Sequence, residues 1–261
     1  MMNKITFCAI VTFCAYQILG LPVISDDAEQ RAGKFEGDIV LSSEQRMALA
    51  GLRNGLSADR YRWPNNTVFY RIISDNFTTE HVGHIHRALD TIGNVSCISF
   101  IEADENATAF VRVVGDDVGC FSAVGYQGSV QDLNLAPNGC FRLGTIIHEF
   151  LHALGFFHMQ SATERDEYVT IVWDNIRRGV ERNFQKYNSS FVTGFNVEYD
   201  YGSVLHYSAT AFSVNGNRTI VPRNENVTIG QRTGMSDGDV TKLNRMYSCD
   251  DAASDNVEAR G

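Results

Sequence analysis

Five residues in the middle of the chain have the types and the spacing of a catalytic metal site. His148 and His152 are four residues apart, so on a helix both imidazoles project from one face towards a single point. Glu149 follows the first histidine and is placed to hold a water molecule on a bound ion. Gly155 lets the chain leave the helix and turn back, which brings His158 to the same point as a third nitrogen ligand. Three protein ligands with an open position are typical of catalytic zinc, whereas structural zinc sites are closed by four, so the spacing predicts one catalytic Zn²⁺ per chain.

The pattern H-E-x-x-H alone also occurs on amphipathic helices that bind no metal. The added glycine and third histidine at the required offsets make a coincidence improbable here. The apolar residues between the ligands agree with this interpretation, since a helix that carries a zinc site must itself be buried. The sequence therefore favours a metal centre over an ordinary core helix.

The extended motif H-E-x-x-H-x-x-G-x-x-H is that of the metzincins, and its surroundings resemble the astacin family of secreted zinc endopeptidases. The stretches that carry the resemblance are F-E-G-D-I at 35–39, R-D-E-Y-V at 165–169, S-V-L-H-Y at 203–207 and G-Q-R at 230–232. Together with four cysteines they cover roughly residues 35–250. The resemblance implies an α+β, metzincin-like fold of two subdomains. An upper twisted sheet with helices and a less regular lower subdomain would enclose the active-site cleft.

The resemblance also implies roles for individual side chains. Glu149 would be the general base that takes a proton from the attacking water and passes it to the leaving amine. Tyr207, from the stretch at 203–207, would be a further zinc ligand at rest that moves to hydrogen-bond the oxyanion. Asp38, from the stretch at 35–39, would occupy the zinc position meant for water in the precursor. A carboxylate is a good zinc ligand, and Gly37 lets the backbone approach the cleft closely.

Two residues depart from the family's pattern. Leu205 stands where the family has a methionine beneath the zinc, and the similar volumes predict a cost below about 1.5 kcal/mol. Met159 stands where the family has a glutamate that pairs with the new amino terminus after activation. A thioether does not pair with an ammonium, so we expect a chain start at Asn54 to stay solvated.

Two classes of function follow from these residues. The first is an active zinc endopeptidase made as a zymogen. The second is a catalytically inert, zinc-binding homologue that acts as a binding or decoy protein, which only the two departures favour. Intact Glu149 and Tyr207 favour the enzyme, because a binding protein has no need of either.

Length, composition and charge limit the class of protein further. At 261 residues and 44% hydrophobic composition, the chain is long enough for one domain with its own core and short extensions. The net charge of −9 argues against a nucleic-acid partner, which would need a basic surface. Outside the first twenty residues, no apolar run reaches the roughly eighteen residues of a membrane-spanning helix, so we expect no membrane partner.

The first twenty residues have the pattern of a secretory signal peptide. Lys4 gives a positive start, an apolar stretch follows over 5–19, and Gly20 is a small residue before the cut. We expect a secreted, extracellular protein with a signal peptide (1–20), a pro-segment (21–53), an astacin-like catalytic domain (54–250) and a disordered tail (251–261). By resemblance, cleavage at Arg53-Asn54 removes the pro-segment, which inhibits the enzyme until then. We expect a monomer that acts on protein or peptide substrates.

Cysteines and sequons fit an exported chain. Cys8 and Cys14 leave with the leader, and the even number that remains suggests two disulfides with three possible connectivities. The resemblance implies the pairs Cys97–Cys249 and Cys120–Cys140. The chain also holds N-x-S/T sequons, which predict a glycoprotein. They begin at Asn65, Asn76, Asn94, Asn106, Asn188, Asn217 and Asn226.

Local patterns predict the elements that would position the site. We expect strands over 67–73, 98–101 and 109–114, and helices over 79–93, 143–154, 175–187 and 237–247. The region 120–140 reads as strands and loops at a sheet edge, where the family pairs with extended substrate. His81, His84 and His86 lie on the first of these helices. With no carboxylate or cysteine to complete a cluster, we expect a solvent-facing surface there and no second metal site.

Overall fold

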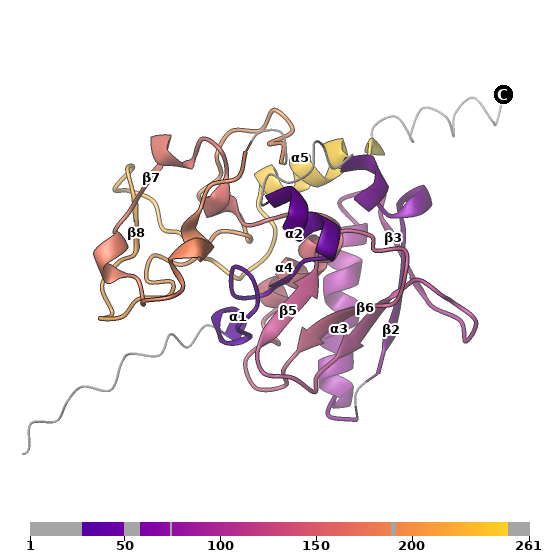
Figure 1. The fold of residues 1–261 in the computed structure, drawn as a ribbon. Helices are drawn as coiled ribbons and strands as arrows, with labels where there is room; N and C mark the ends of the chain where they lie inside the picture. Colours follow the sequence, from indigo (N-terminus) through magenta and orange to yellow (C-terminus); the bar gives the residue numbers. More distant parts are fainter. Residues whose placement is uncertain (1–27, 50–57, 74, 189–191, 250–261) are drawn as a thin grey trace, which may run out of the picture.

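The computed structural model describes residues 28–49, 58–73, 75–188 and 192–249. Within them the chain forms a six-stranded sheet with helices and, beside it, a second part built from loops, short 3-10 turns and a two-stranded sheet (Figure 1). These parts correspond to the predicted upper and lower subdomains of an α+β fold. The predicted signal peptide (1–20), cleavage site Arg53-Asn54 and tail (251–261) lie outside the described residues.

The large sheet has the strand order β1-β5-β6-β4-β2-β3. Its neighbours pair in parallel, except for β5 and β6, which are antiparallel. The strands span Ile39–Val40 (β1), Thr67–Ile72 (β2), Ser99–Glu102 (β3), Val111–Val114 (β4), Cys120–Ala123 (β5) and Gln131–Leu135 (β6). The predicted strands are confirmed, and one edge strand, β1, comes from the predicted pro-segment.

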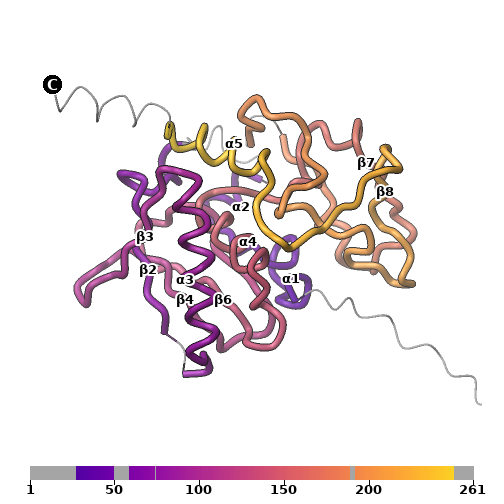
Figure 2. Tube along the Cα trace, turned by 180° about the vertical axis from the view of Figure 1, so that it is seen from behind, coloured from indigo at the N-terminus to yellow at the C-terminus, as the bar shows by residue number. Residues whose placement is uncertain are grey.

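Two long helices pack on the same face of this sheet, as the view from behind shows (Figure 2). α3 (Thr79–Gly93) begins at Thr78, whose hydroxyl accepts a hydrogen bond from the His81 backbone N–H. α4 (Leu143–Ala153) is buried along most of its length, because it lies between the sheet and the second part of the molecule. Both helices were predicted from the sequence. His84 and His86 form hydrogen bonds with Phe141 and Tyr70, so these histidines do not gather into a metal cluster.

The second part has its own core but little regular structure. It contains β7 (Val169–Ile171), β8 (Ile220–Pro222) and the 3-10 turns Met159–Ser161, Arg165–Glu167, Trp173–Asn175 and Glu181–Phe184. The helix predicted over 175–187 is therefore wrong. Ile176 forms a β-bridge with Ser213, and the Arg177 N–H donates to the Phe212 carbonyl. These backbone hydrogen bonds replace the ones that an α-helix would need.

The last helix of the described residues is α5 (Asp237–Met246), which begins with a capping box of Ser236 and Asp239. Disulfides join Cys97 to Cys249 and Cys120 to Cys140, so both expected pairings are confirmed. The long bridge ties the end of α5 to the start of β3. Among the described residues, no helix has the length and apolar character needed to cross a bilayer.

Residues 28–49 lie between the two parts of the molecule (Figures 1 and 2). They form α1 (Ala28–Arg31), β1 and α2 (Ser43–Leu49), and the 3-10 turns Ala58–Tyr61 and Pro64–Asn66 follow further along the chain. The first three residues of α1 are buried. The predicted pro-segment is thus packed into the fold along much of its length.

Candidate metal centre

One helix and the turn that follows it bring the three predicted histidine ligands together. His148 and His152 lie one turn apart on α4, with ring centroids 4.6 Å apart. The helix ends at Ala153, and Gly155 has a φ of +110°, which only glycine adopts without strain. The chain then returns in an extended conformation that places the His158 ring 4.7 Å from the His152 ring. The sequence reasoning about Gly155 is confirmed.

Each of the three imidazoles is held through its Nδ1 atom. The partners are oxygens that only accept hydrogen bonds, so each Nδ1 carries a proton and each Nε2 is turned towards the centre of the site. The pairs are His148 with the Val204 carbonyl (2.8 Å), His152 with the Phe156 carbonyl (2.7 Å) and His158 with the Glu36 carboxylate (2.8 Å). Three Nε2 atoms therefore face the same point, and each of them can bind a cation in place of a proton.

The spacing of the donor atoms fits one zinc ion. The Nε2 atoms of His148 and His152 are 3.0 Å apart. A tetrahedral zinc with Zn–N distances of about 2.0–2.1 Å separates its nitrogen ligands by about 3.3 Å. An Asp38 oxygen lies 3.2 Å from the first Nε2 and 3.3 Å from that of His158. The four groups are all buried, and their ligand atoms lie within 4.8 Å of one another.

Asp38 is held at the centre by the histidines. Burial alone would raise the pKa of its carboxyl, but the charge of His158 and hydrogen bonds from His148 and His158 outweigh burial and lower it below the usual range. The carboxylate is therefore ionised and suited to serve as a zinc ligand. Within the described part of the chain, this is the only group of three or more such residues that could hold a metal.

Glu36 adds contacts that the sequence did not predict. Its carboxylate bonds to His158 Nδ1 and accepts a hydrogen bond of 2.8 Å from the Ser161 hydroxyl. Its carbonyl accepts a hydrogen bond from the Tyr207 hydroxyl. Gly37 has a φ of +92°, and a Cβ there would lie 3.0 Å from the Phe212 ring and 3.2 Å from the Glu29 carbonyl oxygen. The glycine thus allows close packing against α1 and Phe212.

The two candidate catalytic residues lie beside the ligands. Glu149 is fully buried on α4, next to His148. The Tyr207 ring is also buried, with its centroid 4.7 Å from that of His158, and its hydroxyl is engaged by the pro-segment. Leu205, the residue in the methionine's place, packs in the main core as its volume predicts.

A buried ion pair anchors the predicted pro-segment away from the metal site. The Arg232 guanidinium donates from Nε to both carboxylate oxygens of Glu29, at 2.7 and 3.0 Å. Both side chains are about one-twentieth exposed. Burial alone would raise the pKa of Glu29, but Arg232 lowers it to about 2. Sequence reasoning singled out Arg232 only within the stretch at 230–232 and missed Glu29, because no local pattern links residues 203 positions apart.

The predicted pro-segment also covers one edge of the sheet. β1 pairs in parallel with β5, with Ile39 opposite Ser122 and Val40 opposite Ala123. The Ser122 N–H donates to the Asp38 carbonyl at 2.9 Å. The strand that was expected to pair with extended substrate is thus already paired with the chain's own residues.

Comparisons with known proteins agree with this geometry. The family model of the astacin peptidases matches residues 55–248. Seminal metalloprotease 1 of Drosophila melanogaster is 41% identical over 233 residues, which are 86% of this chain and 90% of that protein. Zinc metalloproteinase nas-13 of Caenorhabditis elegans is 37% identical over 87% of this chain, but the chain spans about half (52%) of its length. Likewise, it covers 42% of the worm relative nas-15 and 30% of human meprin A subunit beta.

A solved structure is similar as well. High choriolytic enzyme 1, a hatching enzyme zinc-protease from the medaka Oryzias latipes, superposes with a TM-score of 0.67 at 38% sequence identity. The match covers 72% of this chain and 93% of that one.

Proposed function

Because the chain belongs to the astacin family of zinc metallopeptidases, we propose that it is a secreted zinc endopeptidase, made as a zymogen, that hydrolyses internal peptide bonds of protein substrates. One observation carries the proposal. Three buried imidazoles direct their Nε2 atoms to a single point, and a carboxylate from the chain's own pro-segment is the fourth group there. The arrangement suits a metal centre that is blocked until the pro-segment leaves.

The residues of the site have separate roles in peptide hydrolysis. Bound zinc supplies Lewis acidity, which polarises a carbonyl and makes water a stronger acid. The three histidines hold the ion in a fixed place, since each ring is locked through Nδ1. Glu149, on the same helix, accepts a proton from the attacking water and delivers it to the leaving amine. The Tyr207 hydroxyl, once released from the Glu36 carbonyl, donates a hydrogen bond to the oxygen on which negative charge develops.

In this proposal, three contacts of the pro-segment keep the precursor inactive. Asp38 takes the position that water needs, β1 covers the edge of β5, and Glu29 pairs with Arg232. Cleavage at Arg53-Asn54 would let the segment 21–53 dissociate, and all three of these contacts would be lost together. The pro-segment therefore acts as an inhibitor in the same chain, and we propose a monomer.

Secretion is supported by the disulfides and the sequons. Two disulfides suit an oxidising compartment, which a signal peptide at 1–20 would provide. All seven sequon asparagines are exposed to solvent, as glycosylation requires. The catalytic domain is proposed to span 54–250.

An inert, decoy role has little to favour it. Leu205 is buried in the main core, and Met159 lies outside the group of ligand atoms. The two departures therefore leave the metal centre and Glu149 intact.

Peptidase activity is tested on the full chain after cleavage at Arg53 by an arginine-specific protease. We expect hydrolysis of denatured casein that a zinc chelator abolishes and added zinc restores. A protein that binds zinc but does not hydrolyse casein after complete processing would establish the inert alternative.

A further inference from the structure

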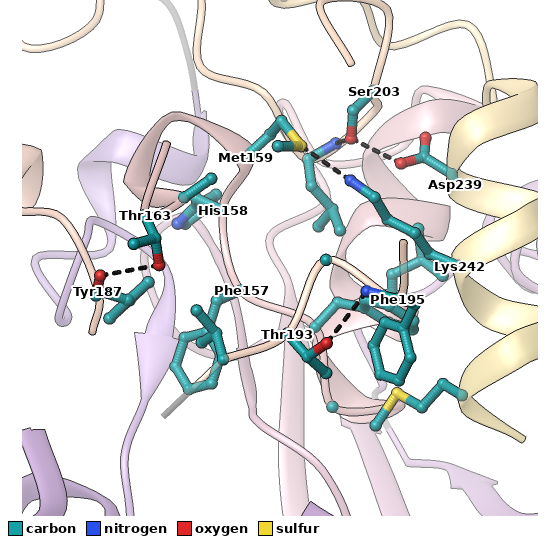
Figure 3. A pocket seen from close by; sticks show the side chains of 18 of the residues that line it. Phe157, His158, Met159, Thr163, Tyr187, Thr193, Phe195, Ser203, Asp239 and Lys242 are labelled. Carbon is teal, nitrogen blue, oxygen red and sulfur yellow. Dashed lines mark hydrogen bonds between the residues drawn. The ribbon is translucent and has the colours of Figure 1, made fainter. Parts of the chain in front are cut away.

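A pocket lies beside the metal centre, between the turn after α4 and helix α5, and His158 forms part of its wall (Figure 3). Its volume is about 140 Å³. Apolar side chains make up much of its wall, among them Leu151, Phe156, Phe157, Leu205 and Met246. Cavities of about 150 Å³ hold a benzene molecule, so the space suits an apolar group of about six to eight heavy atoms.

Charged side chains of both signs line this pocket: the acids Asp239 and Glu164, and Lys242, which points into it. Lys242, on α5, is 8% exposed, and its ammonium lies 3.1 Å from the Met159 sulfur (Figure 3). That thioether is its one hydrogen-bond partner in the described part of the chain. Among the same residues, no carboxylate lies within 4.0 Å of the ammonium. Burial lowers the pKa of Lys242, although Asp239, Asp200 and Glu164 oppose this from a distance.

The nearest acid on the same helix is occupied by other donors. Asp239 accepts hydrogen bonds from the Ser203 hydroxyl at 2.6 Å and from the Val204 N–H at 2.8 Å. Glu164 also lines the pocket but does not reach ion-pair distance. A lysine ammonium has three donors, and a thioether is a weak, uncharged acceptor. The pocket thus holds a buried cation whose remaining donors have, among the described residues, no anion within reach.

We propose that this pocket is a binding site for a small carboxylate with an apolar body. The carboxylate pairs with the Lys242 ammonium, and the body lies against Phe156, Phe157 and the other apolar walls. A buried ammonium is stabilised when an anion is bound beside it, and the apolar group gains by leaving water.

Binding is tested with hexanoate as the probe and 1-hexanol as the uncharged control. The full chain is labelled with ¹³C at its methionine methyl groups, and the signals are followed during titration. Met159 and Met246 line the pocket, whereas Met47 and Met235 do not and serve as internal controls. We expect hexanoate to shift the first two signals saturably and to leave the other two in place, and hexanol to bind much more weakly.

Three variants test whether the charge of Lys242 is responsible for hexanoate binding. Lys242→Met should weaken hexanoate binding by about 10- to 100-fold, as expected for loss of a charged hydrogen bond. Met159→Glu should abolish it as well, because an internal carboxylate then occupies the ammonium. Lys186→Met removes an exposed lysine that pairs with Asp166 and should leave binding unchanged.

The proposal is overturned by several results. These are no saturable shift at Met159 and Met246, equal binding of hexanoate and hexanol, or full affinity in Lys242→Met. If that variant does not fold, Met159→Glu alone gives the answer, since undiminished binding in it would exclude Lys242 as the anion's partner. The proposal is also overturned if Met159 and Met246 are already shielded from solvent before hexanoate is added, because a segment of the chain itself would then fill the pocket.

Discussion

Glu29→Gln is expected to weaken latency although it changes no residue of the metal centre. Burial opposes ionisation of Glu29, yet the charge of Arg232 lowers its pKa from 4.5 to about 2. Since one pKa unit corresponds to about 1.36 kcal/mol, the ionised carboxylate favours the docked pro-segment by roughly 3 kcal/mol. Neutral glutamine removes the negative charge that Glu29 places against the buried Arg232, so docking should weaken by about 10²-fold.

The pH dependence of docking follows from the same shift. A carboxyl whose pKa is lowered in the docked form stabilises that form above its ordinary pKa of 4.5, and the stabilisation disappears as the pH falls towards about 2. Docking should therefore be tightest at neutral pH. The Glu29→Gln precursor should lack this component of the acid dependence, while the parent retains it.

The assay is hydrolysis of a quenched fluorescent peptide by precursors that cannot be processed, each carrying Arg53→Ala. Glu44→Gln is the matched control, because Glu44 is a half-exposed acid of the same segment that pairs with Arg60. Residual activity should rise by about 10²-fold with Glu29→Gln and stay at the parent's level with Glu44→Gln. Equal residual activity in the two variants would refute the anchoring role of the ion pair.

Three further predictions concern the site and its activation. Asp38→Ala in the same unprocessed background should show residual peptidase activity because the fourth ligand is gone. If this variant is inactive, latency rests on the covering strand β1 alone. Tyr207→Phe should lower kcat by about 10²–10³-fold with little change in KM, since an oxyanion donor acts in the transition state, whereas a raised KM alone would make Tyr207 a lining residue. A mature form with one or two extra residues before Asn54 should equal the authentic form in activity and Tm, because Met159 offers no carboxylate to the amino terminus. A tenfold loss of rate would reveal another acid in that role.

Local patterns were sufficient to predict the parts of the fold that follow a repeating sequence rule. The helix α4 and its three histidines were predicted because spacing on a helix fixes which side chains share a face. The helices α3 and α5 were predicted as well, and the structure shows caps at Thr78 and Ser236. These features depend on residues close to one another in the chain.

Contacts between distant segments could not be predicted in this way. The region 175–187 has helical composition, but its backbone pairs with residues near 212, which the sequence does not reveal. The Glu29–Arg232 pair joins two segments brought together only by the folded core. Lys242 and Met159 are 83 residues apart, so the buried ammonium was also invisible to local reasoning.

The central claim is that Glu149 acts as the base beside a zinc ion held by three histidines. The most direct test is to measure zinc content and peptide hydrolysis together in processed Glu149→Ala. The variant should keep its zinc, because no ligand is changed, and lose turnover by about 10²–10⁴-fold or more. Zinc that is lost together with activity, or turnover that survives the substitution, would contradict the assigned role of Glu149.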